Sequence, residues 1–260
     1  MRKQLAKTIY NIYHNDVIKA EKYISKIEYL TKSEIESYQL RKLNLLLDYA
    51  YKYVPFYKII LNSIGFGCKG LKSIDDLKKL PIISKNELRK NFNLFIPKKE
   101  IKFTTGRTSG STGEPLIYRK CNNCKVIEMA LGLRFAKNMG IKIEDRKLLI
   151  WGGIKMNSYN TMIRYIKNYI YNYDVYNNYN INKDSITKLL NKLYKNKYLY
   201  YRSYPSTLAL VAREINNKQQ IFNNCPKVIS VSVETLMESD RNIIEKVFGK
   251  IVYTQNRCEV

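Results

Sequence analysis

Hydrophobic residues recur every three or four positions over the first 60 residues, which is the spacing of one helix face. The clearest case is the stretch LRKLNLLLDYAYKYV, which begins at residue 40. Its apolar stripe consists of Leu40, Leu43, Leu46, Leu47 and Ala50. Pro55 follows, and a proline cannot continue a helix without losing a backbone hydrogen bond. The pattern therefore predicts a long helix that ends at this proline.

Two short segments after residue 70 have the form of a capping box, in which Ser at the helix start pairs with an acidic residue three positions later. They are Ser73-Ile-Asp-Asp76 and Ser84-Lys-Asn-Glu87. Each is expected to begin a short helix. Residues 1–100 are thus predicted to form a helical N-terminal region.

From residue 101 the pattern changes to apolar runs of strand length that alternate with helical segments. Strands are predicted at 115–119, 147–151, 198–204, 227–232 and 250–254. Helices are predicted near 122–139, 184–196, 206–216 and 237–248, the last closed by Gly249. This alternation predicts an α/β fold for residues 101–260, with a largely parallel sheet flanked by helices. Residues 168–184 are rich in Asn and Tyr and are interpreted as a surface insertion or loop.

The composition is that of a folded protein, with 45% hydrophobic and 26% charged residues. No run approaches the roughly 20 apolar residues that cross a bilayer. The basic N-terminal segment lacks the apolar core and cleavage site of a signal peptide. We therefore expect a cytoplasmic protein without a membrane span.

The net charge of +24 raises the question of nucleic-acid binding. The basic residues are dispersed, with no Arg-rich block and no known reader motif, and Lys is abundant together with Asn, Tyr and Ile. An AT-rich coding sequence produces this joint bias. We expect a Lys-rich solvated surface and no nucleic-acid partner, with a field that attracts anionic substrates.

The cysteines are few, odd in number and irregularly spaced: Cys68, Cys121, Cys124, Cys225 and Cys258. This indicates free thiols. Cys121-Asn-Asn-Cys124 has no second ligand pair, and the single histidine, His14, lies far away in the sequence, whereas a zinc site needs about four ligands. The sequence favours two ordinary cysteines beside a strand over a metal site or a redox pair. With one histidine, Ser–His–Asp hydrolysis is also excluded.

The segment that carries chemistry is Thr-Thr-Gly-Arg-Thr-Ser-Gly-Ser-Thr-Gly-Glu-Pro at 104–115, in which nine of twelve residues are Gly, Ser or Thr. Glycines at 106, 110 and 113 permit unusual backbone conformations and close approach of main-chain N–H groups. Together with hydroxyl donors, such a backbone suits a polyphosphate. The spacing is not that of a Walker loop. A polar hairpin loop is the alternative interpretation.

The order of residues in Thr-Ser-Gly-Ser-Thr-Gly-Glu-Pro at 108–115 resembles the phosphate-binding loop of the adenylate-forming superfamily. Three more segments are similar to one branch of it: LLLDYAYKYVPFYK, IDDLKKLPIISKNELRKNF and VISVSVETLMESDRNIIEKVFG. That branch contains phenylacetate–CoA ligases, coenzyme F390 synthetases and CapK-type capsule proteins. The resemblance runs from about residue 40 to the last residue. It implies an incomplete AMP-binding domain over 101–260.

The resemblance assigns binding roles residue by residue. The ATP phosphates would be held by Ser109, Gly110, Ser111, Thr112 and Gly113. Glu234 matches the Glu of a Gly-Glu-x-Leu turn on the adenine side, but Val233 replaces the Gly. Glu259 survives from a Tyr-Gly-x-x-Glu turn and would contact magnesium, unless it is simply part of a polar terminus. Trp151-Gly-Gly153 ends a predicted strand and could line the acyl pocket, as strand ends often do in α/β proteins, or it is a packing turn. Tyr204-Pro205-Ser206 resembles a family turn near the substrate, or it simply starts a helix. Arg107 could pair with phosphate or be solvated.

The reaction implied is activation of a small-molecule carboxylic acid by Mg-ATP to an acyl-adenylate, followed by transfer to a thiol such as CoA. The family's ribose-binding Asp, hinge and C-terminal domain with a catalytic Lys have no counterpart here. We therefore expect a truncated or split gene product, weakly active or inactive alone. An unpaired sheet edge would favour a homo-oligomer or a complementing C-terminal polypeptide. The alternative function is a non-catalytic binding or assembly protein of capsule or cell-envelope polysaccharide synthesis.

Overall fold

The structure is a computed structural model that describes residues 2–67, 69–99, 101–108, 115–151, 168–169, 171–177, 181–218 and 221–254. Two compact units can be distinguished, one comprising Met1–Ile18 with Gly132–Val260 and the other Lys19–Leu131. The divisions fall inside two helices, α2 (Asn15–Ile27) and α6 (Asn122–Asn138). The units are described separately below.

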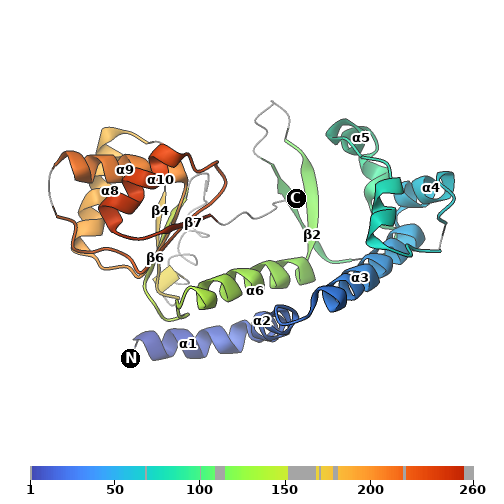
Figure 1. The fold of residues 1–260 in the computed structure, drawn as a ribbon, viewed down its shortest axis with the longest axis horizontal. Helices are drawn as coiled ribbons and strands as arrows, with labels where there is room; N and C mark the ends of the chain where they lie inside the picture. Colours follow the sequence, from blue (N-terminus) through green and yellow to red (C-terminus); the bar gives the residue numbers. More distant parts are fainter. Residues whose placement is uncertain are drawn as a thin grey trace. The chain divides into compact units, whose positions relative to one another are not determined.

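The N-terminal part is helical, as predicted (Figure 1). Besides α2, residues 1–100 form the α-helices α1 (Arg2–Tyr13), α3 (Lys32–Tyr53), α4 (Pro55–Ser63) and α5 (Lys85–Lys90). They also form the 3-10 helices η1 (Ile74–Lys79) and η2 (Phe92–Phe95). The long helix α3 ends just before Pro55, which begins α4 in the first helical position, where its missing N–H costs nothing. In the predicted apolar stripe of α3, Ala50 is buried, but Leu46 is 62% exposed and was wrongly assigned to it.

Both predicted capping boxes are formed. Ser73 is the N-cap of η1 and donates its backbone N–H to Asp76 at 3.0 Å. Ser84 caps α5, where Glu87 N–H donates to the serine hydroxyl at 3.2 Å and the Ser84 N–H donates to the Glu87 carboxylate at 2.7 Å. These reciprocal bonds satisfy N–H groups that have no partner inside the helix. The short helices therefore begin where the sequence places them.

The larger unit contains a five-stranded sheet in which all neighbours are parallel, in the order β4-β3-β5-β6-β7. The strands are β3 (Lys147–Trp151), β4 (Tyr173–Asn177), β5 (Tyr200–Ser203), β6 (Val228–Val231) and β7 (Val252–Thr254). The connecting helices are α8 (Lys183–Lys195), α9 (Pro205–Asn217) and α10 (Glu238–Phe248). The predicted α/β fold with a parallel sheet is confirmed. Gly249 closes α10 in the left-handed conformation with φ 60°, as predicted.

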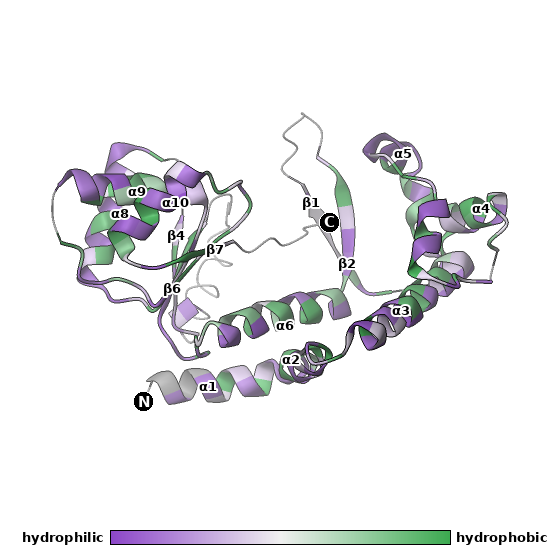
Figure 2. Ribbon diagram, viewed as in Figure 1, coloured by the Kyte–Doolittle hydropathy of each residue, from purple (hydrophilic) through white to green (hydrophobic). Residues whose placement is uncertain are grey.

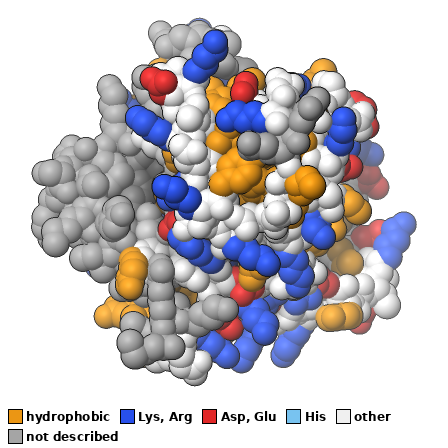
Figure 3. Space-filling view, turned by 90° about the vertical axis from the view of Figure 1, so that its left-hand side faces the viewer, with side chains coloured by type: hydrophobic (Ala, Val, Ile, Leu, Met, Phe, Trp, Pro, Cys, Tyr) orange, Lys and Arg blue, Asp and Glu red, His pale blue; other side chains and the backbone are white. Residues whose placement is uncertain are grey.

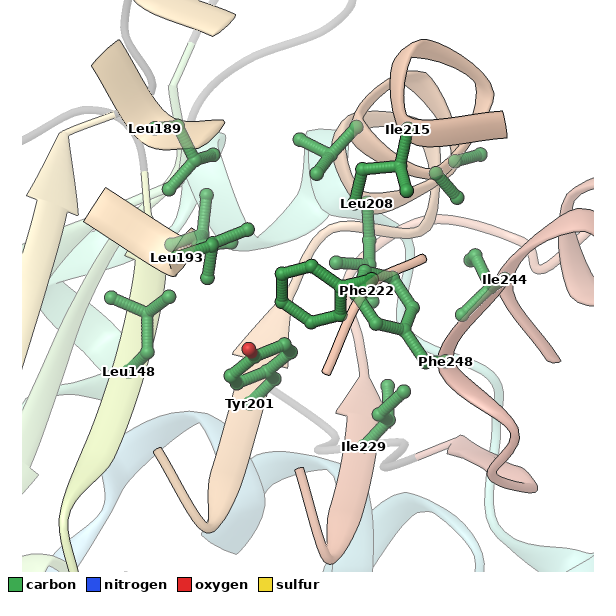
Figure 4. Close-up of a cluster of buried hydrophobic side chains, with 14 of the residues drawn as sticks. Leu148, Leu189, Leu193, Tyr201, Leu208, Ile215, Phe222, Ile229, Ile244 and Phe248 are labelled. Carbon is green, nitrogen blue, oxygen red and sulfur yellow. The ribbon is translucent and has the colours of Figure 1, made fainter. Parts of the chain in front are cut away.

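The main core lies between this sheet and helices α8, α9 and α10 (Figure 4). It includes Leu148 of β3, Tyr201 of β5 and Ile229 of β6, all fully buried. The neighbouring residue Tyr200 belongs to a second cluster on the other face, with the end of α6. Successive strand residues point to opposite faces. Both faces are therefore covered, which explains why these strands are continuously apolar in sequence.

The interpretation of residues 168–184 as a surface loop is wrong for part of that segment. Residues 173–177 form β4, which pairs with β3 in the register Leu148↔Asp174 and Ile150↔Tyr176. Tyr198 donates its hydroxyl to the Asp174 carboxylate at 2.5 Å, and Arg146 forms an ion pair with the same carboxylate at 3.0 Å. Pairing and these long-range polar contacts therefore override the weak strand propensity of this segment.

Hydrophobic and hydrophilic residues both occur on the covering helices α8, α9 and α10 (Figure 2), as expected for helices with one face in a core. Lys and Arg side chains are interspersed with other types over the face shown in Figure 3. Among the described residues, no helix is long and apolar enough to span a membrane.

Candidate functional site

The predicted phosphate-binding segment connects the two strands of a hairpin. Strands β1 (Phe103–Arg107) and β2 (Ile117–Cys121) are antiparallel, and Arg107 pairs with Ile117. Beyond this pair, Thr108 N–H donates to the Leu116 carbonyl at 3.0 Å, and Leu116 N–H donates to the Thr108 hydroxyl at 2.9 Å. These two bonds fix the ends of the connection. Residues Ser109, Gly110, Ser111, Thr112 and Gly113 lie outside the described residues.

Gly106 has a different role from the one its place in the glycine-rich segment suggests. It lies inside β1 directly opposite Tyr118, and its φ is not positive. A Cβ atom here would lie 2.4 Å from the Tyr118 ring. A side chain at this position would therefore force the Tyr118 ring to move, and this close packing, not an unusual backbone conformation, favours glycine here. Arg107, the next residue, is exposed at the end of the strand.

In the larger unit, the carboxyl ends of β3 and β5 form a topological switch point, because the chain proceeds from β3 to β4 in one direction and from β5 to β6 and β7 in the other. Ligands of open parallel sheets bind outside the carboxyl ends of the strands at such points. Trp151 ends β3 and Tyr204 follows β5. Their rings are stacked, with centroids 4.8 Å apart and an interplanar angle of 25°. The Arg202 guanidinium lies 5.3 Å from the Trp151 ring centroid.

Glu234, the predicted adenine-side residue, lies at the same edge, after β6. Its carboxylate accepts hydrogen bonds from the Ser206 N–H at 3.2 Å and from the Ser206 hydroxyl at 2.6 Å. Ser206 is in the first turn of α9, where the helix dipole favours a negative charge. Glu234 therefore joins the end of β6 to the start of α9 and so helps to fix the two turns that border this edge.

The residue before Glu234 has a strained backbone. Val233 has φ 81°, a left-handed conformation that a β-branched residue rarely adopts. This is the position at which the Gly-Glu-x-Leu turn has its glycine. The turn thus has a backbone suited to glycine but contains valine, at a cost of about 1–2 kcal/mol. Val233 is 64% exposed, so packing does not offset that cost.

Two buried hydroxyls also lie at this edge. Ser203 ends β5 and is completely buried, and Ser232 follows β6 and is 5% exposed. Ser232 N–H donates to the Ser203 carbonyl at 3.2 Å. Neither hydroxyl has a hydrogen-bond partner among the described residues. A buried hydroxyl without a partner costs about 1–3 kcal/mol, so a polar group from outside the described residues would stabilise both serines.

The sequence interpretation singled out Trp151, Tyr204, Ser206 and Glu234, and the structure brings them to one edge of the sheet. It did not identify Arg202, Ser203 or Ser232. The last two could have been found as the polar residues that end two apolar strands. Glu259 lies outside the described residues. Within the described ranges, no three His, Cys, Asp or Glu side chains are arranged to bind a metal ion.

No protein-family profile matches the chain. Over 109 residues the chain is 34% identical to a phenylacetate–coenzyme A ligase of Thermus thermophilus. The aligned region covers 40% of this chain and 24% of the ligase. Over 96 residues it is 32% identical to the phenylacetate–coenzyme A ligase of Aromatoleum evansii, covering 36% and 22% respectively. Protein CapK of Staphylococcus aureus is 23% identical over 240 residues, 90% of this chain and 52% of CapK.

The chain is thus similar to phenylacetate–CoA ligases over about two fifths of its length, and to CapK over 90% of its length. It spans about half the length of CapK. Among solved structures, 2-hydroxyisobutyryl-CoA ligase in the postadenylation state with R3-HIB-AMP matches with a TM-score of 0.64 and 18% identity, covering 88% of this chain and 50% of that one. The open conformation of that ligase with 2-HIB-AMP and CoA matches with a TM-score of 0.62 and 20% identity, covering 86% and 54%. At these identities the likeness shows the fold alone: the chain shares the fold of about half of that ligase.

Proposed function

We propose that the chain acts in AMP-forming activation of a carboxylic acid, with CoA as the acceptor. The observation that carries this proposal is its relationship to the phenylacetate–CoA ligases, on a fold shared with a CoA ligase. In the first step the carboxylate of the acid attacks the α-phosphorus of Mg-ATP and expels pyrophosphate. In the second step the thiol of CoA attacks the acyl carbon and expels AMP.

The residues take roles that suit this chemistry. The hydroxyls and main-chain N–H groups of residues 109–113 bind the ATP phosphates, and the bonds between Thr108 and Leu116 hold the ends of that segment. Glu234 fixes the turn on the adenine side through Ser206. Trp151 and Tyr204 form a wall of the acyl pocket. Glu259 is the carboxylate proposed to contact the magnesium of Mg-ATP. Catalysis then rests on positioning and on neutralising phosphate charge.

The test is ATP binding by calorimetry with and without magnesium. Ser111→Ala with Thr112→Ala removes two hydroxyl donors to a charged group. Each such bond is worth about 1.5–3 kcal/mol, so the affinity should fall at least roughly tenfold. The matched control, Ser37→Ala with Thr187→Ala, removes two exposed helix hydroxyls and should leave the affinity unchanged. Equal affinity in the wild type and the Ser111/Thr112 variant would contradict the proposal.

Turnover is tested separately by exchange of labelled pyrophosphate into ATP, with phenylacetate and short aliphatic acids as probes. Exchange that depends on one of these acids supports the first step. ATP binding without exchange in the presence of any acid would restrict the proposal to nucleotide binding by this chain.

A further inference from the structure

Cys121 and Cys124 are adjacent in space as well as in sequence. Cys121 is the last residue of β2, and Cys124 lies in the first turn of α6. Their sulfur atoms are 3.1 Å apart, about 1 Å more than the length of a disulfide bond. Cys124 N–H also donates to the Cys121 sulfur at 3.4 Å. The strand-to-helix junction thus holds the two sulfurs within reach of bond formation.

The two thiols differ in their electrostatic environments. Hydrogen bonding from the Cys124 thiol, and then from the Cys124 backbone N–H, lowers the pKa of Cys121. The same pairing and partial burial raise the pKa of Cys124. Thiolates are stabilised at helix N-termini. Cys124 is exposed and Cys121 partly exposed, so a small reagent can reach them. The Cys121 thiolate is therefore suited to attack a disulfide first, and the Cys124 thiol to attack the resulting mixed disulfide second.

Charged groups also lie beside the pair. The Lys120 ammonium and the Glu128 carboxylate form an ion pair at 2.6 Å. Glu128 raises the pKa of Cys124, though less than the pairing with Cys121 and burial do. This charge adds to the difference between the two thiols.

We propose that Cys121 and Cys124 form a thiol–disulfide exchange site whose substrates are low-molecular-weight disulfides. This site is separate from the proposed ligase function and does not depend on it. The sequence alone favoured two ordinary cysteines; the sulfur–sulfur distance and the helix N-terminus provide the evidence for a reactive pair.

The reaction proceeds in two balanced steps. The Cys121 thiolate attacks one sulfur of a disulfide R–S–S–R, which forms a mixed disulfide on Cys121 and releases one R–S⁻. Cys124 then loses its proton and attacks the Cys121 sulfur, which forms the Cys121–Cys124 disulfide and releases the second R–S⁻. Two electrons pass from the protein thiols to the disulfide reagent. Excess free thiol reverses both steps.

Cys225 provides an internal control. Its thiol donates to the Phe222 carbonyl at 3.1 Å, and burial raises its pKa. It packs against the main core and has no second cysteine beside it among the described residues. It should therefore react slowly with disulfides and form no intramolecular bond under conditions in which the pair is oxidised.

The test uses the full chain and glutathione disulfide as the probe. The reaction is stopped with acid, free thiols are alkylated, and the protein is digested with trypsin. Trypsin releases residues 121–125, Cys-Asn-Asn-Cys-Lys, as one peptide whose only cysteines are Cys121 and Cys124. We expect it mainly as the intramolecular disulfide, formed at least roughly tenfold faster than any adduct on Cys225. Dithiothreitol should reverse the oxidation. If both thiols stay reduced, or react no faster than Cys225, the proposal is wrong.

Two variants separate the roles of the two sulfurs. Cys124→Ser should accumulate a glutathione adduct on Cys121, because the second thiol is absent. Cys121→Ser should leave Cys124 largely unmodified over the same time. Cys225→Ser should still form the disulfide at the wild-type rate. Circular dichroism checks that each variant is folded. Preferential adduct formation on Cys124 in the wild type would overturn the assignment of Cys121 as the attacking thiol.

Discussion

The Trp151 ring lies stacked on the Tyr204 ring, with 4.8 Å between centroids, and so joins the carboxyl ends of two adjacent parallel strands. Trp151 is also the single tryptophan of the chain. Its fluorescence therefore reports on the sheet edge at which the proposed acyl pocket lies, without an added label.

The first prediction concerns this fluorescence. Phenylacetate bound at the carboxyl edge should change Trp151 emission in a saturable way, because it alters the polarity around the indole. Tyr204→Ala should shift the emission of the unliganded protein, since the stack is lost. If calorimetry detects phenylacetate binding while Trp151 emission stays constant, the acid binds elsewhere.

The second prediction concerns Val233 and its φ of 81°. Val233→Gly should stabilise the protein by about 0.5–1 kcal/mol, because relief of the left-handed strain exceeds the extra entropy of an unfolded glycine. Val233→Ala is the matched control: it removes the same exposed methyl groups but keeps a Cβ, so it should leave most of the strain in place. Urea unfolding measures both. Equal stability of the glycine and alanine variants would show that the conformation costs little.

The third prediction concerns the hairpin. Gly106→Ala should destabilise it by about 1–3 kcal/mol, because the added methyl group overlaps the Tyr118 ring. Tyr118→Ala removes that ring, so Gly106→Ala should cost much less in the double variant. The interaction energy from this double-mutant cycle, measured by thermal unfolding, is the critical quantity. Additive effects would mean that the ring does not pack on the glycine.

The fourth prediction concerns Lys147, whose ammonium donates to the carbonyls of Ile143 and Asp145. Burial lowers the pKa of Lys147 to about 8, although nearby Asp145 and Glu144 raise it. Its ordinary value is 10.5. Between these values the unfolded chain binds the proton more tightly, so this lysine's contribution to stability rises with pH.

The measurement is the difference in free energy of unfolding between the wild type and Lys147→Met. From pH 8 to 9.5 this difference should change by up to roughly 2 kcal/mol in favour of the wild type. Using a difference removes the effect of tyrosines that ionise in the same range. A difference that is constant with pH would contradict the lowered pKa.

Much of the fold could be predicted because the decisive signals are local. The strand at 147–151 was predicted to the residue, and both capping boxes could be read from four-residue patterns. β4 could not be predicted, because its strand state depends on pairing with β3 and on contacts of Asp174 with residues more than 20 positions away. The prediction for Leu46 is wrong because the spacing of apolar residues identifies one face of a helix, but does not show how much of that face a neighbouring element covers.

The candidate site is less accessible from sequence for the same reason. The bond from Ser206 to Glu234 joins residues 28 positions apart, and the stack of Trp151 on Tyr204 depends on the strand order. The replacement of glycine by Val233 was visible in the sequence. Only the structure shows that the backbone keeps the glycine conformation.

The β1–β2 hairpin has a different chemistry at each end. The Thr108–Leu116 bonds close one end, and Cys121, paired with Phe103, leads to the dithiol at the other. If oxidation of the sulfur pair changes ATP affinity, thermodynamic linkage requires ATP to change the reduction potential of the pair by the same free energy. A redox titration of Cys121 and Cys124, with and without ATP, would then report on ATP binding. The reduction potential of the cysteine pair would change when ATP occupies the segment at the other end of the hairpin.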